Sequence, residues 1–443
     1  MTNISDNWLS ELNQQQRTAV TNTNGPLLVV AGAGSGKTRT LAYKVAYLIS
    51  QGVDPERILL LTFTRRAANE MISRAAQAIS MSSSSVNQVW GGTFHAIANR
   101  LLRIYAQTAG ISPDFTIIDQ SDAADSIDII RHKKSFTKLN KRFPRKGTCL
   151  AVYSRCMNSS DDLAQILKVH FPWCEQWKDK LKELFKEYVI YKQGNNILDY
   201  DDLLLYLYHL LGNKSVANAI EQRFEYILVD EYQDTNRLQA NILYRLRQSN
   251  TNIMAVGDDA QSIYSFRSAS IQNMLDFPKK YPHTVIVKLE QNYRSTKYIL
   301  KTTNSMIEQS KECFHKTLYT NRETGQHPQL ITCKDESHEN ETVIQHVLKH
   351  YEQGIPLHNQ AVLFRASSHS NSLEIALTQK NIPFHKYGGL RFLEASHVKD
   401  LISILRILEN PRDEMAWFRI LKLFDGIGPA TASHIFEHVK QNS

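Results

Sequence analysis

The chain has 443 residues, of which 42% are hydrophobic, and its formal net charge is +8. This length and composition suit a globular protein of roughly two to four domains. No apolar run approaches the roughly 18 residues of a membrane span, and the N-terminus lacks a leader pattern. The sequence therefore excludes a membrane protein and predicts a cytoplasmic one. The five cysteines include no C-x-x-C pair, which excludes a disulfide framework and a zinc site. The positive charge is weak evidence for a polyanionic partner.

Short runs of β-branched and aliphatic residues recur along the chain, and each is bounded by turn residues. They lie at residues 27–30, 58–63, 226–229, 253–256 and 285–289. Such near-continuous apolar runs are typical of strands that are buried on both faces of a parallel sheet. Helical periodicity lies between them, for example at residues 38–49 and 67–79. The alternation predicts the α/β class.

Changes in this rhythm divide the chain. Residues 106–196 are rich in Lys, Arg, Ser and aromatic residues with helical periodicity, clearest at 179–191. A second α/β segment is expected from 285, with further strands at 329–332 and 360–364. The predicted parts are a first α/β domain of 1–105 and 197–284, a helical insertion of 106–196, a second α/β segment of 285–387 and a helical segment of 388–443.

A glycine-rich loop directly after the run 27–30 carries the strongest local signal. It consists of Ala31, Gly32, Ala33, Gly34, Ser35, Gly36, Lys37 and Thr38. Between a strand and a helix, such a loop surrounds phosphate oxygens with backbone N–H groups, the lysine reaches the β and γ phosphates, and the threonine ligates Mg²⁺. The alternative is a glycine-rich turn with an incidental lysine.

A second motif supports the first interpretation. The run 226–229 ends in Asp230 and Glu231. At the carboxyl edge of the sheet, Asp230 can hold Mg²⁺ and Glu231 can orient the attacking water. The alternative is an ordinary acidic turn after a strand. Together the two motifs predict hydrolysis of ATP or GTP.

Six motifs narrow the family. They are Leu12-Asn-Gln-Gln-Gln16-Arg17, Thr62-Phe-Thr-Arg-Arg66-Ala-Ala, Gly92-Thr-Phe-His95, Asp230-Glu-Tyr-Gln-Asp234-Thr235, Val256-Gly-Asp-Asp-Ala-Gln261-Ser-Ile-Tyr264 and Gln291-Asn-Tyr293-Arg294-Ser. Their order resembles that of superfamily 1 DNA helicases of the UvrD/Rep/PcrA family, from about residue 10 to the end of the chain. The resemblance implies RecA-like P-loop motor domains with mostly helical accessory insertions, and an ATP-dependent helicase of 3′-to-5′ polarity that acts in DNA repair or replication.

The resemblance also assigns the nucleotide contacts. It implies that Gln16 reads the adenine edge and that Arg39 and Tyr293 flank the base and ribose, which makes the nucleotide ATP. Gln261 is expected to sense the γ-phosphate from the first motor domain. Arg294 is expected to approach it from the second, with a surface arginine as the alternative.

The expected DNA track combines aromatic and polar side chains. Bases stack on aromatic rings in proteins that bind single strands, and the resemblance points to Phe63, Tyr264 and Phe266. Phe266 stands where the family usually has Trp. For the DNA backbone we expect contacts from Thr64, Arg65, Thr93, His95, Arg267 and Arg365. Core packing is the alternative for Phe63, and it is the preferred interpretation of Phe94.

The last part of the chain resembles the family's second accessory domain, entered at residues 388–392. The turn at Gly426 is interpreted either as a duplex contact or as a plain helix cap. We find no counterpart of the family's late motifs, so we expect a truncated or split product, with a possible second chain that supplies them. The main hypothesis is a helicase acting on single-stranded DNA and ss/dsDNA junctions. The alternatives are an ATP- and DNA-binding module without autonomous unwinding and, less favoured, an RNA substrate.

Overall fold

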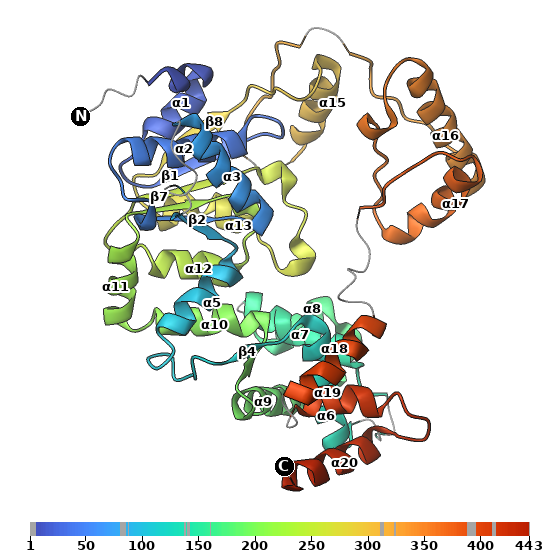
Figure 1. Cartoon of the computed structure of the whole chain (residues 1–443). Helices are drawn as coiled ribbons and strands as arrows, with labels where there is room; N and C mark the ends of the chain where they lie inside the picture. Colours follow the sequence, from blue (N-terminus) through green and yellow to red (C-terminus); the bar gives the residue numbers. More distant parts are fainter. Residues whose placement is uncertain are drawn as a thin grey trace. The chain divides into compact units, whose positions relative to one another are not determined.

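The structure is a computed structural model, and it divides the chain into two compact units, Met1–His327 and Pro328–Ser443 (Figure 1). It describes residues 6–79, 86, 88–136, 139, 142–159, 161–310, 314–322, 325–387, 396–409 and 413–442. Among these residues, no helix has both the length and the apolar character needed to cross a membrane.

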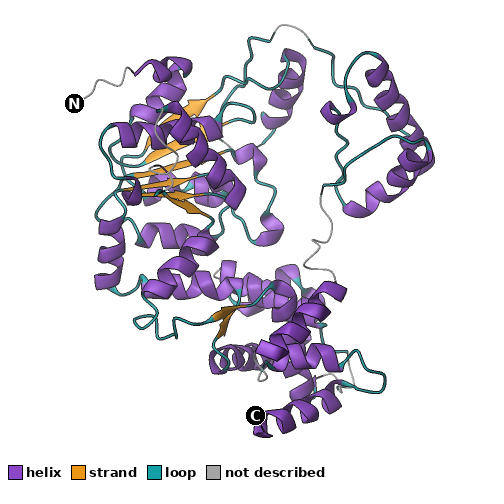
Figure 2. Ribbon diagram, in the orientation of Figure 1, coloured by secondary structure: helices purple, strands orange, loops and turns teal. Residues whose placement is uncertain are grey.

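The first unit is built on a six-stranded sheet with the strand order β3-β2-β6-β7-β1-β8 (Figure 2). All five strand pairings are parallel. The strands are β1 (Leu27–Ala31), β2 (Ile58–Leu61), β3 (Trp90–Gly92), β6 (Tyr226–Val229), β7 (Ile253–Gly257) and β8 (Val285–Leu289). The predicted α/β class is confirmed.

Alternate residues of each central strand face two separate hydrophobic cores, as side chains of a strand must. Leu28 and Val30 of β1 pack into one core, and Leu27 and Val29 into the other. Helices α1 (Gln14–Thr21), α2 (Lys37–Ser50) and α3 (Arg65–Ala78) cover the second face. Helices α5 (Phe94–Ile104), α10 (Tyr200–Leu210), α11 (Lys214–Arg223) and α12 (Arg237–Arg245) cover the first. With both faces covered, the long apolar strands of the sequence are accounted for.

The described part of residues 106–196 is mostly helical and belongs to the first unit. It contains β4 (Thr116–Ile117), α6 (Gln120–Lys133), α7 (Lys146–Ser159), α8 (Leu163–His170), the 3-10 helix η4 (Pro172–Trp177) and α9 (Lys178–Gly194). The strand β4 pairs with β5 (Ile197–Leu198), through which the chain returns to the sheet domain.

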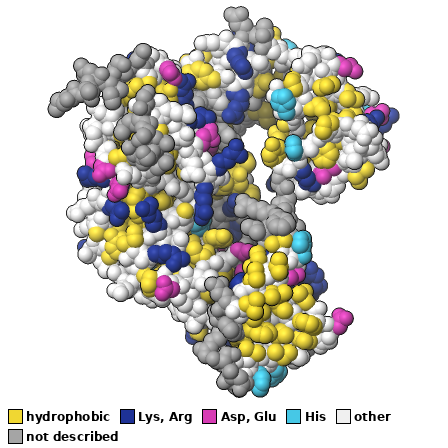
Figure 3. All heavy atoms as spheres, in the orientation of Figure 1, with side chains coloured by type: hydrophobic (Ala, Val, Ile, Leu, Met, Phe, Trp, Pro, Cys, Tyr) yellow, Lys and Arg dark blue, Asp and Glu magenta, His cyan; other side chains and the backbone are white. Residues whose placement is uncertain are grey.

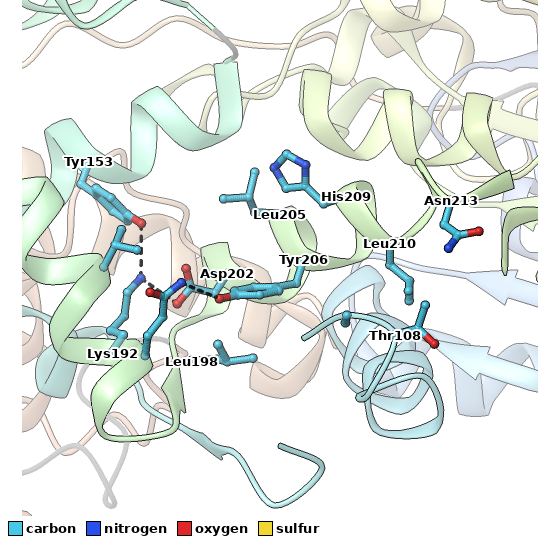
Figure 4. Close-up of a pocket in the computed structure, with 13 residues that line it drawn as sticks. Thr108, Tyr153, Lys192, Leu198, Asp202, Leu205, Tyr206, His209, Leu210 and Asn213 are labelled. Atoms are coloured by element: carbon cyan, nitrogen blue, oxygen red, sulfur yellow. Dashed lines mark hydrogen bonds and ion pairs between the residues drawn. The ribbon is translucent and has the colours of Figure 1, made fainter. Parts of the chain in front are cut away.

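A buried ion cluster fixes this return. Lys192 of α9 is 2% exposed and lies 2.7 Å from Asp199 and 2.6 Å from Asp202 of α10. Tyr153 of α7 lies 3.3 Å from the same ammonium group, and Figure 4 shows its hydroxyl pointing toward it. The cluster borders a cavity of about 370 Å³. Because a buried ammonium group is tolerated only when it is paired, these contacts lock the insertion to the sheet domain.

Further helices of the first unit come after β6 in the chain, and several of them contain or border predicted site residues. They are the 3-10 helices η5 (Tyr232–Asp234), η6 (Asp259–Gln261) and η7 (Ser265–Arg267), and the α-helices α13 (Gln272–Leu275), α14 (Phe277–Lys280) and α15 (Lys297–Ile307). Two more 3-10 helices, η1 (Asp6–Glu11) and η2 (Pro55–Arg57), precede α1 and β2.

In its described residues the second unit consists of helices and extended segments. The helices are α16 (Glu336–Glu352), η8 (Leu357–Asn359), η9 (Ser367–Ser370), α17 (Asn371–Gln379), α18 (Ser396–Glu409), α19 (Glu414–Leu421) and α20 (Pro429–Asn442). Figure 3 shows hydrophobic side chains gathered over α18 to α20, where Leu401, Leu405 and Leu408 are exposed. The predicted entry into this segment, at residues 388–392, lies outside the described residues.

The structure corrects the predicted second α/β segment. The strand expected to open it, β8, pairs with β1 over five residues and is the edge strand of the first sheet. Residues 329–332 and 360–364 form no strand, and Leu330 and Leu363 are 96% and 93% exposed. An apolar run predicts an extended backbone, but a strand also needs a partner, and the run does not say which sheet supplies it.

Candidate functional site

The glycine-rich loop runs from the last residue of β1, Ala31, to the second residue of α2, Thr38, so it lies between a strand and a helix as the sequence predicts. Gly34 and Gly36 have φ angles of 72° and 86°, in the left-handed region that favours glycine. A Cβ atom at Gly36 would also lie 2.6 Å from Nε2 of Gln16, and one at Gly34 would lie 2.7 Å from Cβ of Arg294. These glycines therefore permit both the turn and the close approach of two predicted nucleotide contacts.

The acidic end of β6 faces the lysine of this loop. Nζ of Lys37 lies 3.2 Å from Oε2 of Glu231, and the lysine side chain is only 10% exposed. Glu231 has a φ angle of 47°, which is uncommon for a residue other than glycine. A non-glycine residue held in this conformation is a common feature of functional sites. The predicted pairing of the loop with the second motif is thus present in the geometry.

Two carboxyl groups near Glu231, those of Asp230 and Asp234, have raised pKa values, although the nearby charge of Lys37 opposes the shift. Burial, followed by the charge of Glu231, raises the pKa of Asp230 to about 7. Burial also raises the pKa of Asp234 to about 6. Among the described residues, Oδ1 of each group is buried without a hydrogen-bond partner. Oxygen atoms in this situation suit a hard divalent cation, and Thr38 at the start of α2 offers a hydroxyl ligand. The residues therefore fit Mg²⁺.

The predicted base contacts lie beside the loop. Gln16 is 1% exposed and donates from Nε2 to the carbonyl of Ser35 at 3.0 Å. Its Oε1 accepts from the backbone N–H of Asn13 at 3.2 Å. Arg39 forms an ion pair of 2.5 Å with Glu11, which also accepts from the hydroxyl of Tyr43 at 2.6 Å. A contact of Gln16 with adenine therefore has to compete with bonds that it already makes.

Asn13 is a residue that the sequence reasoning missed. Its amide donates to the hydroxyl of Tyr293 at 2.9 Å and to Oε1 of Gln291 at 3.2 Å. It also caps α1, because its side chain accepts from the backbone N–H of Gln16. Asn13 thus links Gln16, near the N-terminal end of the first unit, to Tyr293, near its C-terminal end.

The segment after β8 packs directly on the loop. Asn292 donates from Nδ2 to the carbonyl of Ala33 at 2.6 Å, and the N–H of Tyr293 donates to the carbonyl of Gly34 at 2.9 Å. Oδ1 of Asn292 accepts from the backbone N–H groups of Arg294 and Ser295. Asn292 is a second residue that the sequence analysis missed, and it holds Arg294 next to the glycine-rich loop, the predicted phosphate loop.

The structure corrects one part of the Arg294 prediction. Arg294 belongs to the same compact unit as Lys37, whereas we expected it on a second lobe. The reason is that β8 joins the first sheet and carries the following residues with it. The arginine is exposed, so its side chain remains available to a ligand in the loop.

Gln261 is connected to this site through Gln233. The side chain of Gln261 donates to Asp258, whose backbone N–H donates to Oε1 of Gln233 at 2.9 Å. Nε2 of Gln233 in turn donates to Glu231 at 2.8 Å. Gln233, a third missed residue, lies within a motif in which we assigned roles only to Asp230 and Glu231. The predicted γ-phosphate sensor and the predicted catalytic base thus share one hydrogen-bonded network.

The three predicted base-stacking side chains lie together on the surface. The rings of Phe63 and Tyr264 are 4.8 Å apart, and those of Tyr264 and Phe266 are 5.8 Å apart. Phe63 is 39% exposed and Phe266 65% exposed, so core packing does not explain them. The guanidinium group of Arg267 lies within 6 Å of the last two ring centroids, at 5.5 and 5.7 Å. Phe94, in contrast, is buried in the core as expected.

The predicted backbone contacts have more varied surroundings. Thr64 and Thr93 cap α3 and α5, and Arg65 is exposed at the first residue of α3. His95 packs edge-on against Tyr200, and burial lowers the pKa of its imidazole to about 4, so this side chain is neutral at pH 7.

The remaining predicted contacts belong to the second unit. Arg365 is exposed there. Gly426, in the turn that precedes α20, has a φ angle of 81°.

Family models decide the relationship of the chain to known proteins. Residues 12–282 match the model described as UvrD/REP helicase N-terminal domain. The chain belongs to the UvrD/REP helicase family. Residues 287–443 match the UvrD-like helicase C-terminal domain, which begins within β8. The two UvrD-type models therefore divide the chain close to our expected boundary at 285, whereas spatial packing divides it after His327.

Relatives of this UvrD-type chain include proteins named ATP-dependent DNA helicase PcrA. Those from Staphylococcus aureus (strain Mu50) and Staphylococcus epidermidis (strain RP62A) are each 35% identical, over 439 and 441 residues. These alignments cover 98% of this chain and 59% of each relative, so the chain spans less than two thirds of their length. Because both family domains match within one chain, the comparisons give no support to the second chain that we considered.

Proposed function

We propose that the chain is an ATP-dependent DNA helicase that moves 3′ to 5′ along single-stranded DNA and separates duplexes at ss/dsDNA junctions. The proposed setting is DNA repair or replication in the cytoplasm. One observation carries the proposal. The hydrogen bonds from Glu231 through Gln233 to Asp258 join the phosphate loop to the segment that bears Tyr264 and Phe266. A nucleotide-dependent change at Glu231 therefore has a direct path to the exposed rings.

In the proposed reaction Lys37 binds the β and γ phosphates, and Thr38 and Asp230 would hold Mg²⁺, which would neutralise phosphate charge. Lys37 is now paired with Glu231. Bound phosphates compete for this lysine, so they release the carboxylate to orient the attacking water. The base is expected between Arg39 and Tyr293, with Gln16 at its edge.

Two further residues are assigned to the γ-phosphate. Arg294 lies beside Gly34 and is expected to stabilise charge on the transferring phosphoryl group, a role worth about 10³ to 10⁵ in rate. Gln261 is expected to report the presence of the γ-phosphate, because its hydrogen bond to Asp258 links it to the aromatic segment.

On the DNA side, Phe63, Tyr264 and Phe266 offer rings for base stacking. Each stacked base contributes about 1 to 3 kcal/mol, and the stacking tolerates any sequence because every base has a π-face. Arg267 adds positive charge beside these rings. The geometry thus supports a grip on single strands without sequence preference.

The experiment measures ATP hydrolysis by the purified chain without and with single-stranded DNA, and strand displacement on duplexes with a 3′ or a 5′ tail. Stimulation by DNA and displacement only from the 3′ tail are the expected results. Stimulation without any displacement would assign the chain to the alternative, an ATP- and DNA-binding module. Stronger stimulation by matched RNA would overturn the DNA assignment. ATP hydrolysis at the same rate with and without DNA or RNA would overturn the proposal.

A further inference from the structure

A buried lysine outside the six motifs stands next to the nucleotide site. The ammonium group of Lys316 lies 2.7 Å from Oδ1 of Asp258 and also contacts Oδ1 of Asp259. The three side chains are at most 2% exposed. Burial alone would lower the pKa of Lys316, but the two carboxylates outweigh it and the pKa is raised. Lys316 is therefore a permanent cation that pairs with two adjacent buried acids and offsets one of their two negative charges.

The segment around Lys316 also contacts the phosphate loop. The side chain of Leu318 packs against Gly32, since a Cβ atom added there would lie 2.2 Å from Cδ2 of Leu318. The carbonyl of Tyr319 accepts from the N–H of Asn292 at 2.7 Å, and Asn292 holds the loop at Ala33. A shift of the loop therefore acts directly on the strip of chain that carries Lys316.

Asp258 connects this lysine to both sides of the proposed motor. One of its carboxylate oxygens binds Lys316, and the other accepts from the side chain of Gln261. Its backbone N–H bonds to Gln233, which binds Glu231. Tyr264 follows Gln261 by three residues, so the position of Asp258 also sets that of the aromatic segment.

We propose that Lys316 is a positioning residue that couples the state of the nucleotide to the DNA-binding segment, by holding Asp258 where Gln261 and Tyr264 both depend on it. This inference rests on the proposed function. Without the cation, two neighbouring buried carboxylates repel each other, and the turn from Asp258 to Tyr264 shifts to reach water. The nucleotide still binds Lys37, but DNA no longer accelerates its turnover.

The test compares full-length wild type, Lys316→Met and Lys316→Arg. Lys279→Met serves as the matched control, because Lys279 is also paired with an acid, Asp276, but is 78% exposed. The readout is the ratio of ATP turnover with saturating single-stranded DNA to turnover without it, together with the KM for ATP. Lys316→Met should lower this ratio by about tenfold, within the usual range of coupling between two sites, while KM changes by less than about threefold. Lys316→Arg should retain most of the ratio, and Lys279→Met all of it.

A second variant tests the electrostatic cause. Lys316→Met with Asp259→Asn removes one of the two unpaired carboxylates, so it should recover part of the lost ratio. An unchanged ratio in Lys316→Met overturns the inference alone. A parallel loss of nucleotide affinity, with no recovery in the double variant, also overturns it, because Lys316 then only stabilises the fold. If DNA does not stimulate the wild type, the proposed function fails and this inference fails with it.

Discussion

Arg294 lies in the same compact unit as Lys37, so the role that we propose for it at the phosphates needs no second lobe. Its backbone N–H is held by Asn292, and its Cβ atom lies against Gly34. Because the side chain is exposed, small movements of the following segment can bring it to the γ-phosphate or remove it. The residue is thus positioned by the loop and available to the ligand.

Arg294→Ala should therefore lower the ATP turnover number at least about 100-fold, because the charge of the transferring phosphoryl group loses its guanidinium partner. The KM for ATP should change by less than about threefold, since Lys37 and the loop retain ground-state binding. Steady-state kinetics with single-stranded DNA present measures both. Arg57→Ala is the matched control, because Arg57 pairs with Glu225 at the opposite edge of the sheet. An equal loss of turnover and affinity would contradict the assigned role.

His95 gives a pH dependence that can be measured as stability. Burial lowers the pKa of its imidazole from 6.5 to about 4, so between these values the unfolded chain binds a proton that the folded chain does not. The free energy of unfolding should fall as the pH decreases from about 6.5 to about 4, by up to roughly 3 kcal/mol. Urea unfolding at a series of pH values should show a flatter dependence in His95→Gln. An identical slope in both proteins would exclude His95 as its source.

At the residue scale, the sequence predicted the side chains with a proposed chemical role, but not the side chains that position them. Lys37, Asp230 and Glu231 follow from short contiguous motifs, since a loop and a strand end determine their neighbours. Asn292 and Asn13 are different, because their hydrogen-bond partners are far away in the sequence. Asn292 binds Ala33, which is separated from it by 259 positions, and Asn13 binds Tyr293, which is separated from it by 280 positions. No local pattern contains such a partner, and only the folded sheet brings the two together.

At the scale of secondary-structure elements, the strands were predictable but their sheet was not. The runs at β1, β6 and β7 lie in the centre of the sheet, where burial on both faces demands continuous apolar residues. The run at β8 has the same character, yet it closes the edge beside β1. Residues 329–332 share that character and form no strand. Pairing is a property of two segments, so composition alone cannot assign it.

The aromatic side chains of η7 and of the turn before it, Phe266 and Tyr264, lead to a prediction at this scale. Tyr264→Ala and Phe266→Ala should each weaken binding of single-stranded DNA by about 1 to 3 kcal/mol, because each removes a ring on which a base stacks. Phe266→Trp should strengthen it, because the indole is larger. Fluorescence anisotropy with a labelled oligonucleotide measures these affinities. Trp173→Ala, which removes a 65% exposed ring from η4, should leave the affinity unchanged. Equal effects of Trp173→Ala and Tyr264→Ala would contradict a specific stacking surface.

At the scale of the whole molecule, the nucleotide and stacking residues concentrate in one unit. The loop, the acids after β6, Gln261 and Arg294 all lie within Met1–His327, as do Phe63, Tyr264 and Phe266. This unit has two extensive cores on the faces of its sheet. The second unit has a small core around Ile344 and Leu373. The proposed chemistry of the site therefore depends on residues of the first unit, and what the second unit adds to the proposed movement along DNA can be tested separately.

A fragment that ends at His327 should consequently fold and bind ATP with an affinity within about threefold of that of the full chain, because every nucleotide contact described above remains in it. It should displace no strand, since a motor needs a second body that moves against the first. Titration with a fluorescent ATP analogue, and strand displacement on a 3′-tailed duplex, give the two readouts, with circular dichroism to confirm the fold. A well-folded fragment without nucleotide affinity would show that the second unit completes the site. Displacement by the fragment would show that the first unit and its helical insertion alone can move on DNA, and the second unit would then need another role.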